Sequence, residues 1–168
     1  MSRRKTRIVA KGYSQIEGID YMDSFTPVAH LESMHTVLSI AASLDWEIHQ
    51  FDVKTEFLHG DLMEDIYMEQ PEGQKARGKE TWVCKLHKLL YGLQQAGRCW
   101  YMRLYDEIHR AGFTRVSVDH SVFVKQSSKG VRVLVYVSIS FVHSDCVISA
   151  GVGFMVASSA VASHELDL

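Results

Sequence analysis

The feature that most constrains the fold is a run of alternating apolar residues, VRVLVYVSISFV, from position 131 to position 142. Every second residue from Val131 to Phe141 is valine, isoleucine or phenylalanine. Because successive side chains of a β-strand point to opposite faces of a sheet, this period predicts a long strand with one continuous apolar face. The sequence SVFVK, followed by the turn residues QSSKG, predicts an antiparallel partner immediately before it.

Helical and extended patterns precede this hairpin. Apolar residues at helical spacing predict a first helix, with Leu31, Met34, Leu38 and Ala41 on one side. The segment WEIHQFDV then alternates as a strand and places Asp52 near its end. A short strand is expected in TWVCKLH, and a second helix over about 94–110. This order of elements predicts an α+β domain in which helices pack on one face of an antiparallel sheet.

Composition places the chain among ordinary globular proteins. Of its 168 residues, 46% are hydrophobic and 23% are charged, which suits one compact domain. The net charge of −2 provides no overall attraction to nucleic acid. Three widely spaced cysteines predict neither a disulfide framework nor a zinc site. The N-terminus is polar and basic and has no apolar signal-peptide segment, so we expect a cytoplasmic or nuclear protein that is not secreted.

A stretch of eighteen residues without a charge, CVISAGVGFMVASSAVAS, occupies 146–163. Its length is the minimum for a transmembrane helix, and serine, alanine and glycine dilute its hydrophobicity. The composition therefore favours a buried or poorly ordered tail, with a membrane-associated segment as the alternative.

Four longer motifs carry a family resemblance. They are KTRIVAKGYSQIEGIDYMDSFTPVAHLESM, WEIHQFDVKTEFLHGDLMEDIYMEQPEG, VCKLHKLLYGLQQAGRCWY and DHSVFVKQSSKGVRVLVYV. In this order they closely resemble the reverse transcriptase of Ty1/copia-type retrotransposons, from about residue 3 to residue 137. The resemblance predicts a reverse-transcriptase-like fingers and palm fragment over 1–137. It also predicts a divergent apolar tail without a family match over 138–168.

The fold that this resemblance implies is the right hand of polymerases, of which the chain would supply the end of the fingers and most of the palm. It would lack the thumb, the connection and the ribonuclease H region, so a fragment of a polyprotein is expected. The implied partners are an RNA or DNA template-primer, a deoxynucleoside triphosphate and the missing parts of the polyprotein.

The chemistry that the resemblance implies is nucleotidyl transfer on two divalent metal ions. Magnesium prefers oxygen ligands, and in the family one aspartate ends a palm strand while two more lie in a YVDD hairpin beside it. Asp52 matches the first, so it is the expected catalytic residue and Mg²⁺ ligand. Ser138 and Ile139 stand where the two hairpin aspartates belong. The predicted function is therefore a catalytically inactive fragment of an RNA-directed DNA polymerase.

An alternative alignment restores one of these carboxylates. If residues 139–144 were an insertion, Asp145 would match the second hairpin aspartate. The loop that carries it would then be longer, and misplacing a catalytic group by about 1 Å can lower a rate by about 100-fold. Asp145 is thus a second candidate catalytic residue.

By resemblance, five further positions are expected to bind the incoming nucleotide: Lys5, Arg7, Phe57, Tyr91 and Gly92. Lys5 and Arg7 resemble cations of the fingers that grip the triphosphate. Phe57 resembles an aromatic ring that excludes a ribose 2′-hydroxyl, and Tyr91 and Gly92 would touch the new base pair.

Three neighbouring residues depart from the family pattern. Glu56 replaces an alanine and would place a carboxylate beside the triphosphate. Gln94 replaces a lysine and removes a positive charge, and Gly97 replaces a proline and loosens the turn before the second helix.

Three functions follow as hypotheses. The first is the inactive polymerase fragment. The second is a non-catalytic relic that binds nucleic acid or protein, and the third is a membrane-associated protein anchored by 146–163.

Overall fold

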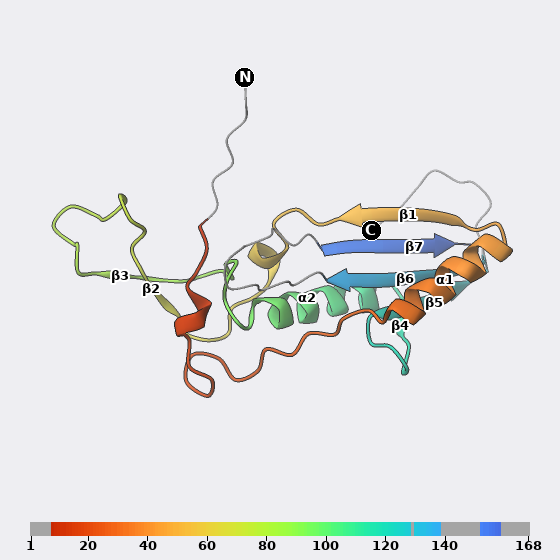
Figure 1. Cartoon of the computed structure of the whole chain (residues 1–168), viewed down its shortest axis with the longest axis horizontal. Helices are drawn as coiled ribbons and strands as arrows, with labels where there is room; N and C mark the ends of the chain where they lie inside the picture. The colour runs from red at the N-terminus through yellow and green to blue at the C-terminus, as the bar shows by residue number, and fades with distance from the viewer. Residues whose placement is uncertain (1–7, 129, 139–151, 159–168) are drawn as a thin grey trace, which may run out of the picture. The chain divides into compact units, whose positions relative to one another are not determined.

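The computed structural model describes residues 8–128, 130–138 and 152–158, and it divides into two compact units. The first unit contains Met1–Thr26 and Thr55–Arg103, and the second contains Pro27–Lys54 and Leu104–Leu168. The ribbon in Figure 1 follows the chain through both units. Each unit is described by itself below.

The second unit is built on an antiparallel sheet of five strands in the order β1-β7-β6-β5-β4. The strands are β1 (Glu47–Asp52), β4 (Thr114–Arg115), β5 (Val122–Ser127), β6 (Gly130–Ser138) and β7 (Val152–Ser158). The mixture of helices with an antiparallel sheet confirms the predicted α+β class.

The predicted hairpin is present as β5 and β6, whose register runs from Val122 opposite Val135 to Ser127 opposite Gly130. The described part of the predicted long strand ends at Ser138. Its remaining positions, including Ile139 and Phe141, lie outside the described residues. The boundary predicted after residue 137 falls within β6, and β7 comes from the segment predicted as a tail.

One face of this sheet is covered by α1 (Leu31–Ser43). Val37 and Ala41 of the helix are buried in one cluster with Val122 of β5 and Val135 of β6. Val135 is one of the alternating positions predicted to form the apolar face of the strand, and Ala41 belongs to the predicted apolar side of the helix. Burial of this face is therefore the packing that the alternation predicted.

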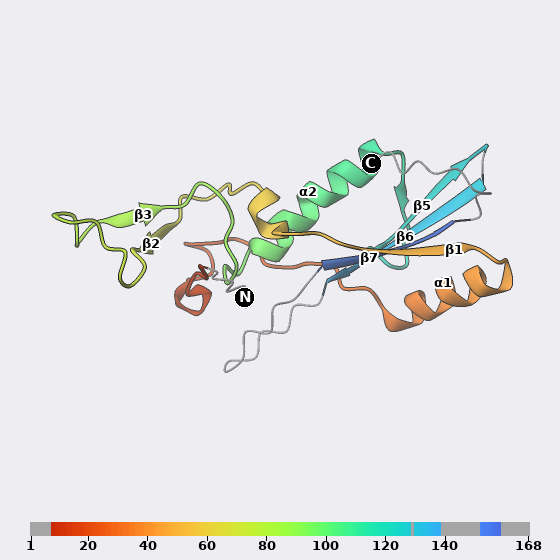
Figure 2. The same cartoon turned by 90° about the horizontal axis from the view of Figure 1, so that it is seen from above.

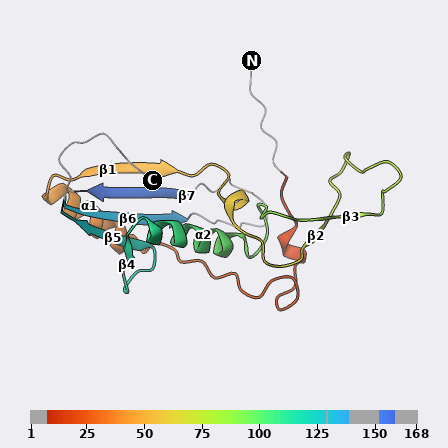
Figure 3. The ribbon, with the colours of Figure 1, turned by 180° about the vertical axis from the view of Figure 1, so that it is seen from behind.

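The opposite face is also covered, so the prediction that helices pack on one face is wrong. Phe123 follows Val122 along β5 and therefore points the other way, and its ring lies 6.2 Å from that of Tyr105. Tyr105 belongs to the part of α2 (Ala96–Arg110) that lies in this unit. Figures 2 and 3 show α1 and this helix on opposite sides of the strands. The reason is that the intervening residues, such as the fully buried Tyr136, are themselves large and apolar.

The first unit contains a two-stranded antiparallel sheet of β2 (Tyr67–Glu69) and β3 (Val83–Lys85). It also has two short 3₁₀ helices, η1 (Gly12–Ser14) and η2 (Glu56–His59), and the first half of α2. Its core is a separate apolar cluster of Ala10, Ile66, Leu89, Leu93 and Ala96.

A buried carboxylate joins α1 to β5 in the second unit. Asp119 is 4% exposed and accepts hydrogen bonds from the main-chain N–H of His30 (3.1 Å) and of Ser121 (2.9 Å). His30 is the N-cap residue of α1 and makes no side-chain cap of its own, so Asp119 supplies an acceptor at that helix end. Burial alone would raise the pKa of Asp119, but hydrogen bonds from Ser121, Ser33 and His30 outweigh it and lower the pKa to about 2.

We predict that Asp119→Asn lowers the free energy of unfolding by about 2 kcal/mol at pH 7, because the folded-state pKa is about 2 and the ordinary value is 3.8. A lowered pKa stabilises the folded state above the ordinary value, and this contribution is lost as the pH falls through the folded-state value. Urea unfolding at several pH values measures the difference between variant and parent. Asp106→Asn, at an exposed position of α2, is the control. If the loss of unfolding free energy in Asp119→Asn did not shrink toward pH 2, the lowered pKa of Asp119 would not be its cause.

Candidate active site

The end of β1 and the end of β6 lie on either side of β7. Asp52, the last residue of β1, pairs with Gly153 of β7, and Val137 of β6 pairs with the same glycine. Ser138 pairs with the preceding residue, Val152. Because neighbouring strands are about 4.8 Å apart, the main chains of Asp52 and Val137 are separated by roughly 10 Å. The sheet thus brings the predicted first aspartate position and the start of the predicted hairpin to one end of one unit.

The residues at this end offer few ligands for a metal ion. Two divalent ions need several hard oxygen ligands that converge from different strands. Asp52 is exposed and supplies one carboxylate. Ser138 is the last residue of β6, which lies on the other side of β7 from β1. Within the described ranges, no group of three or more His, Cys, Asp or Glu residues could hold a metal ion. The described residues therefore do not fit a two-metal site. Asp145 lies outside them.

The nucleotide-binding prediction falls mainly in the first unit, where Phe57 and Tyr91 are in contact. Their ring centroids are 4.8 Å apart and the planes meet at 66°, an edge-to-face arrangement. Phe57 comes from η2 and Tyr91 from the segment before α2. The structure thus brings together two aromatic residues that are 34 positions apart in the sequence. Lys5 and Arg7 lie outside the described residues.

A close crossing of two main-chain segments holds Tyr91 and Gly92 in place. The N–H of Ala10 donates to the carbonyl of Tyr91 at 2.8 Å. Gly92 has φ +94°, and a Cβ there would lie 2.2 Å from the Ala10 carbonyl oxygen. A Cβ on Gly12 would lie 1.8 Å from the Gly92 carbonyl oxygen. Both positions require glycine because the two segments of the chain touch through their backbones.

Three glutamines reinforce this crossing, of which Gln15 and Gln95 had no predicted role. Gln95, 1% exposed, accepts a hydrogen bond from Nε2 of Gln15 at 3.1 Å. Oε1 of Gln15 accepts the main-chain N–H of Gln94, whose own side chain donates to the carbonyl of Gly12. Gln94 therefore uses its amide within the protein, where the family pattern has a lysine. The pair of adjacent glutamines, Gln94 and Gln95, was the one feature of the sequence that could have indicated these hydrogen bonds.

The turn between Asp52 and Phe57 has an unusual backbone. Thr55 has φ 58° and ψ 39°, the left-handed region that β-branched residues rarely adopt. Glu56, which follows, is 2% exposed. The carboxylate expected beside the triphosphate is thus buried within the first unit.

The comparisons with known proteins agree with the motifs. The family described as reverse transcriptase (RNA-dependent DNA polymerase) matches residues 1–160. The chain belongs to this reverse transcriptase family. The family match continues beyond residue 137, where the sequence resemblance was expected to end. Reverse transcriptases of this family usually use divalent metal ions.

Three transposon proteins are similar to this reverse transcriptase segment. It is 49% identical over 137 residues to the retrovirus-related Pol polyprotein from transposon TNT 1-94 of Nicotiana tabacum, covering 80% of this chain and 10% of the relative. It is 45% identical over 138 residues to the Pol polyprotein from transposon RE1 of Arabidopsis thaliana, covering 82% of this chain and 9% of the relative. It is 41% identical over 138 residues to the Pol polyprotein from transposon RE2 of the same plant, covering 82% of this chain and 10% of the relative. The chain thus spans about a tenth of the length of these curated relatives. The predicted family is confirmed.

No solved structure matches the chain. No helix in the described part of this reverse transcriptase chain is long and apolar enough to cross a bilayer. The described portion of the uncharged stretch 146–163 is β7, which is a strand of the sheet.

We predict that Gly92→Ala destabilises the first unit by about 1 kcal/mol more than Gly73→Ala. Both glycines have positive φ, so both variants incur the left-handed backbone cost of about 1–2 kcal/mol. Only at Gly92 does the new Cβ meet another main chain, since nothing lies within 4 Å at Gly73. Urea unfolding followed by tryptophan fluorescence measures both. Equal effects of the two substitutions would argue against the close crossing.

Proposed function

We propose that this chain is a fingers and palm fragment of a Ty1/copia-type retrotransposon reverse transcriptase and that it does not synthesise DNA. The observation that carries the proposal is the register at the ends of β1, β7 and β6. This register pairs both Asp52 and Val137 with Gly153, and Ser138 follows Val137 at the end of β6. This register supports the proposal, because serine stands in the sequence where the family resemblance expects the first hairpin aspartate.

The proposed loss of activity follows from the charge that two metal ions require. A serine hydroxyl and an isoleucine side chain provide no anionic oxygen, so Asp52 would be left as the chief protein ligand of Mg²⁺. A displacement of about 1 Å can already lower a rate about 100-fold, and loss of a ligand removes more of the transition-state stabilisation. In this proposal residues 1–137 supply the fingers and palm fragment, and the departure from the family's hairpin motif begins at Ser138.

The nucleotide-facing residues support the assignment to a polymerase. Phe57 and Tyr91 remain paired, and the glycines at the main-chain crossing are present. We assign Phe57, Tyr91 and Gly92 to contacts with a deoxynucleoside triphosphate and the template base, and Lys5 and Arg7 to its phosphates. The partners of the fragment are then a template-primer and the other parts of a Pol polyprotein in the cytoplasm or nucleus.

We predict no primer extension by the chain with Mg²⁺ or Mn²⁺ on an RNA template with a DNA primer. The assay includes Asp52→Asn and the double variant Ser138→Asp with Ile139→Asp, which restores the family's carboxylates. Incorporation by the parent chain that Asp52→Asn abolishes would overturn the proposal. Incorporation by the double variant alone would identify the missing carboxylates as its cause.

The second candidate function is binding of nucleic acid without catalysis, which the retained Phe57–Tyr91 pair favours because aromatic side chains stack on bases. The net charge of −2 limits the number of phosphates that lysine and arginine can neutralise. We predict weak binding to an RNA–DNA hybrid that falls several-fold between about 50 and 200 mM salt. Fluorescence anisotropy measures it, with Tyr91→Ala as the variant that weakens it. Binding that is absent, or that does not depend on salt, would exclude this function.

A further inference from the structure

Gln15 links two segments of the first unit that are far apart in the sequence. Its Nε2 donates to Oε1 of Gln95 at 3.1 Å, and its Oε1 accepts the main-chain N–H of Gln94 at 2.8 Å. A primary amide carries donors and an acceptor on one planar group, so a single side chain can hold two consecutive residues in a fixed relation. Gln15 thereby binds residues that lie 79 and 80 positions further along the chain.

The hydrogen bonds of Gln94 and Gln95 close this link into a network. Nε2 of Gln94 donates to the carbonyl of Gly12 at 3.1 Å, and the same carbonyl accepts the N–H of Gln15 at 3.1 Å. Nε2 of Gln95 donates to the carbonyl of Asp20 at 3.4 Å. Gln95 is 1% exposed, so removal of the Gln15 amide would take a donor from a buried oxygen. The three amides therefore depend on one another.

The network lies on the other side of Gly92 from the bond between Ala10 and Tyr91. Gly92 has φ +94°, and glycine has more conformational freedom than any other residue, so its order must come from its surroundings. The N–H of Ala10 fixes the chain before this glycine, where it donates to the carbonyl of Tyr91. The two bonds of Gln15 fix the chain after it, at residues 94 and 95.

The side chain that depends on this order is Tyr91. Its ring centroid lies 4.8 Å from that of Phe57 at an angle of 66°, and such an edge-to-face contact requires a defined distance and direction. Phe57 is held separately, because its carbonyl accepts the N–H of Gly60 and its ring packs against the core cluster of the unit. The geometry of the aromatic pair is therefore set by how firmly the segment around Tyr91 is held.

We propose that Gln15 is a positioning residue for binding at Tyr91 and Gly92. It acts through Gln94 and Gln95, and it keeps Tyr91 and Gly92 in the arrangement that receives a nucleic-acid base. This role rests on the proposed function, which assigns these two residues to contacts with a nucleotide and the template base. A site that is ordered before its ligand arrives avoids the entropic cost of ordering during binding, so loss of the Gln15 amide weakens binding.

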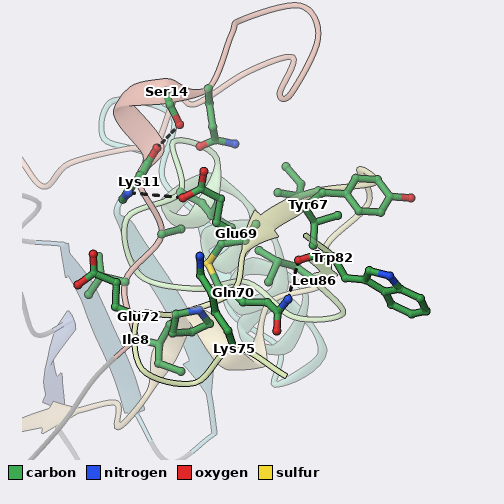
Figure 4. A pocket seen from close by; sticks show the side chains of 18 of the residues that line it. Ile8, Lys11, Ser14, Tyr67, Glu69, Gln70, Glu72, Lys75, Trp82 and Leu86 are labelled. Carbon is green, nitrogen blue, oxygen red and sulfur yellow. Dashed lines mark hydrogen bonds and ion pairs between the residues drawn. The ribbon is translucent and has the colours of Figure 1, made fainter. Parts of the chain in front are cut away.

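A matched pair of variants separates this role from a general effect of losing an amide. Gln15→Met keeps an unbranched side chain of similar length and offers no N–H donor. Gln70→Met is the control, because Gln15 and Gln70 both line a groove of about 920 Å³ beside β2, which Figure 4 shows. The amide of Gln70 also makes three hydrogen bonds, but these go to main-chain groups of the loop between β2 and β3.

Hydrogen exchange of the Ala10 amide measures the order of the crossing without a ligand, because this N–H donates to Tyr91. The amide of Leu86, which donates to the carbonyl of Ile66, reports the stability of the same unit as a whole. We expect Gln15→Met to speed the exchange of Ala10 relative to Leu86 by about tenfold or more. The positioning role is overturned if the Ala10 rate is unchanged, if both rates rise equally, or if Gln70→Met has the same effect.

A double-mutant cycle tests the link to binding, by fluorescence anisotropy with the RNA–DNA hybrid. We expect Gln15→Met to weaken binding by about threefold or more in the parent chain, and to have little effect once Tyr91→Ala has removed the ring. Gln70→Met should bind as the parent does. If the effects of Gln15→Met and Tyr91→Ala multiply, Gln15 does not act through Tyr91 and the proposal is overturned. If the parent chain does not bind the hybrid, the nucleic-acid binding proposed above fails, and the exchange of Ala10 alone decides whether Gln15 positions Tyr91.

Discussion

The pairing of β7 with both β1 and β6 is the interaction on which the candidate active site depends. Six residue pairs join β7 to β1 and seven join it to β6, so the relative positions of the strand ends are set by main-chain hydrogen bonds. Such bonds do not require particular side chains at the ends. Asp52 and Ser138 therefore keep their positions at the strand ends whichever side chains stand there. The fold of the second unit and the chemistry at its edge are separable properties.

Local patterns were sufficient to predict the elements that carry the site. The alternation from residue 131 and the turn before it correspond to β5 and β6, and the helical spacing from residue 31 corresponds to α1. Asp52 ends β1 as the alternation of WEIHQFDV indicated. These elements were accessible because their signals are periodic over one element. The roles of Phe57 and Tyr91 came from family resemblance alone, since nothing in their local sequence distinguishes them from core aromatics.

Long-range packing was the part that the sequence did not reveal. The alternation in β6 predicted one apolar face, formed by the valines. Leu134 and Tyr136, which point to the opposite face, are also buried and require a second covering layer. The uncharged stretch 146–163 gave no indication that its described part would form the strand between β1 and β6. The acceptor for the start of α1 is Asp119, 89 residues from His30, and no local pattern connects them. Partners so distant in sequence have no local signature, because tertiary structure alone brings them together.

The two candidate sites lie in different compact units of the chain. Asp52 and Ser138 belong to the second unit, whereas Phe57, Tyr91 and the groove beside β2 belong to the first. The first unit is stabilised by its own apolar cluster, the main-chain crossing at Gly12 and Gly92, and the hydrogen bonds of Gln15 and Gln95. None of these contacts involves Asp52 or Ser138. A substitution at Asp52 or Ser138 is therefore expected to leave the interactions that build the first unit intact.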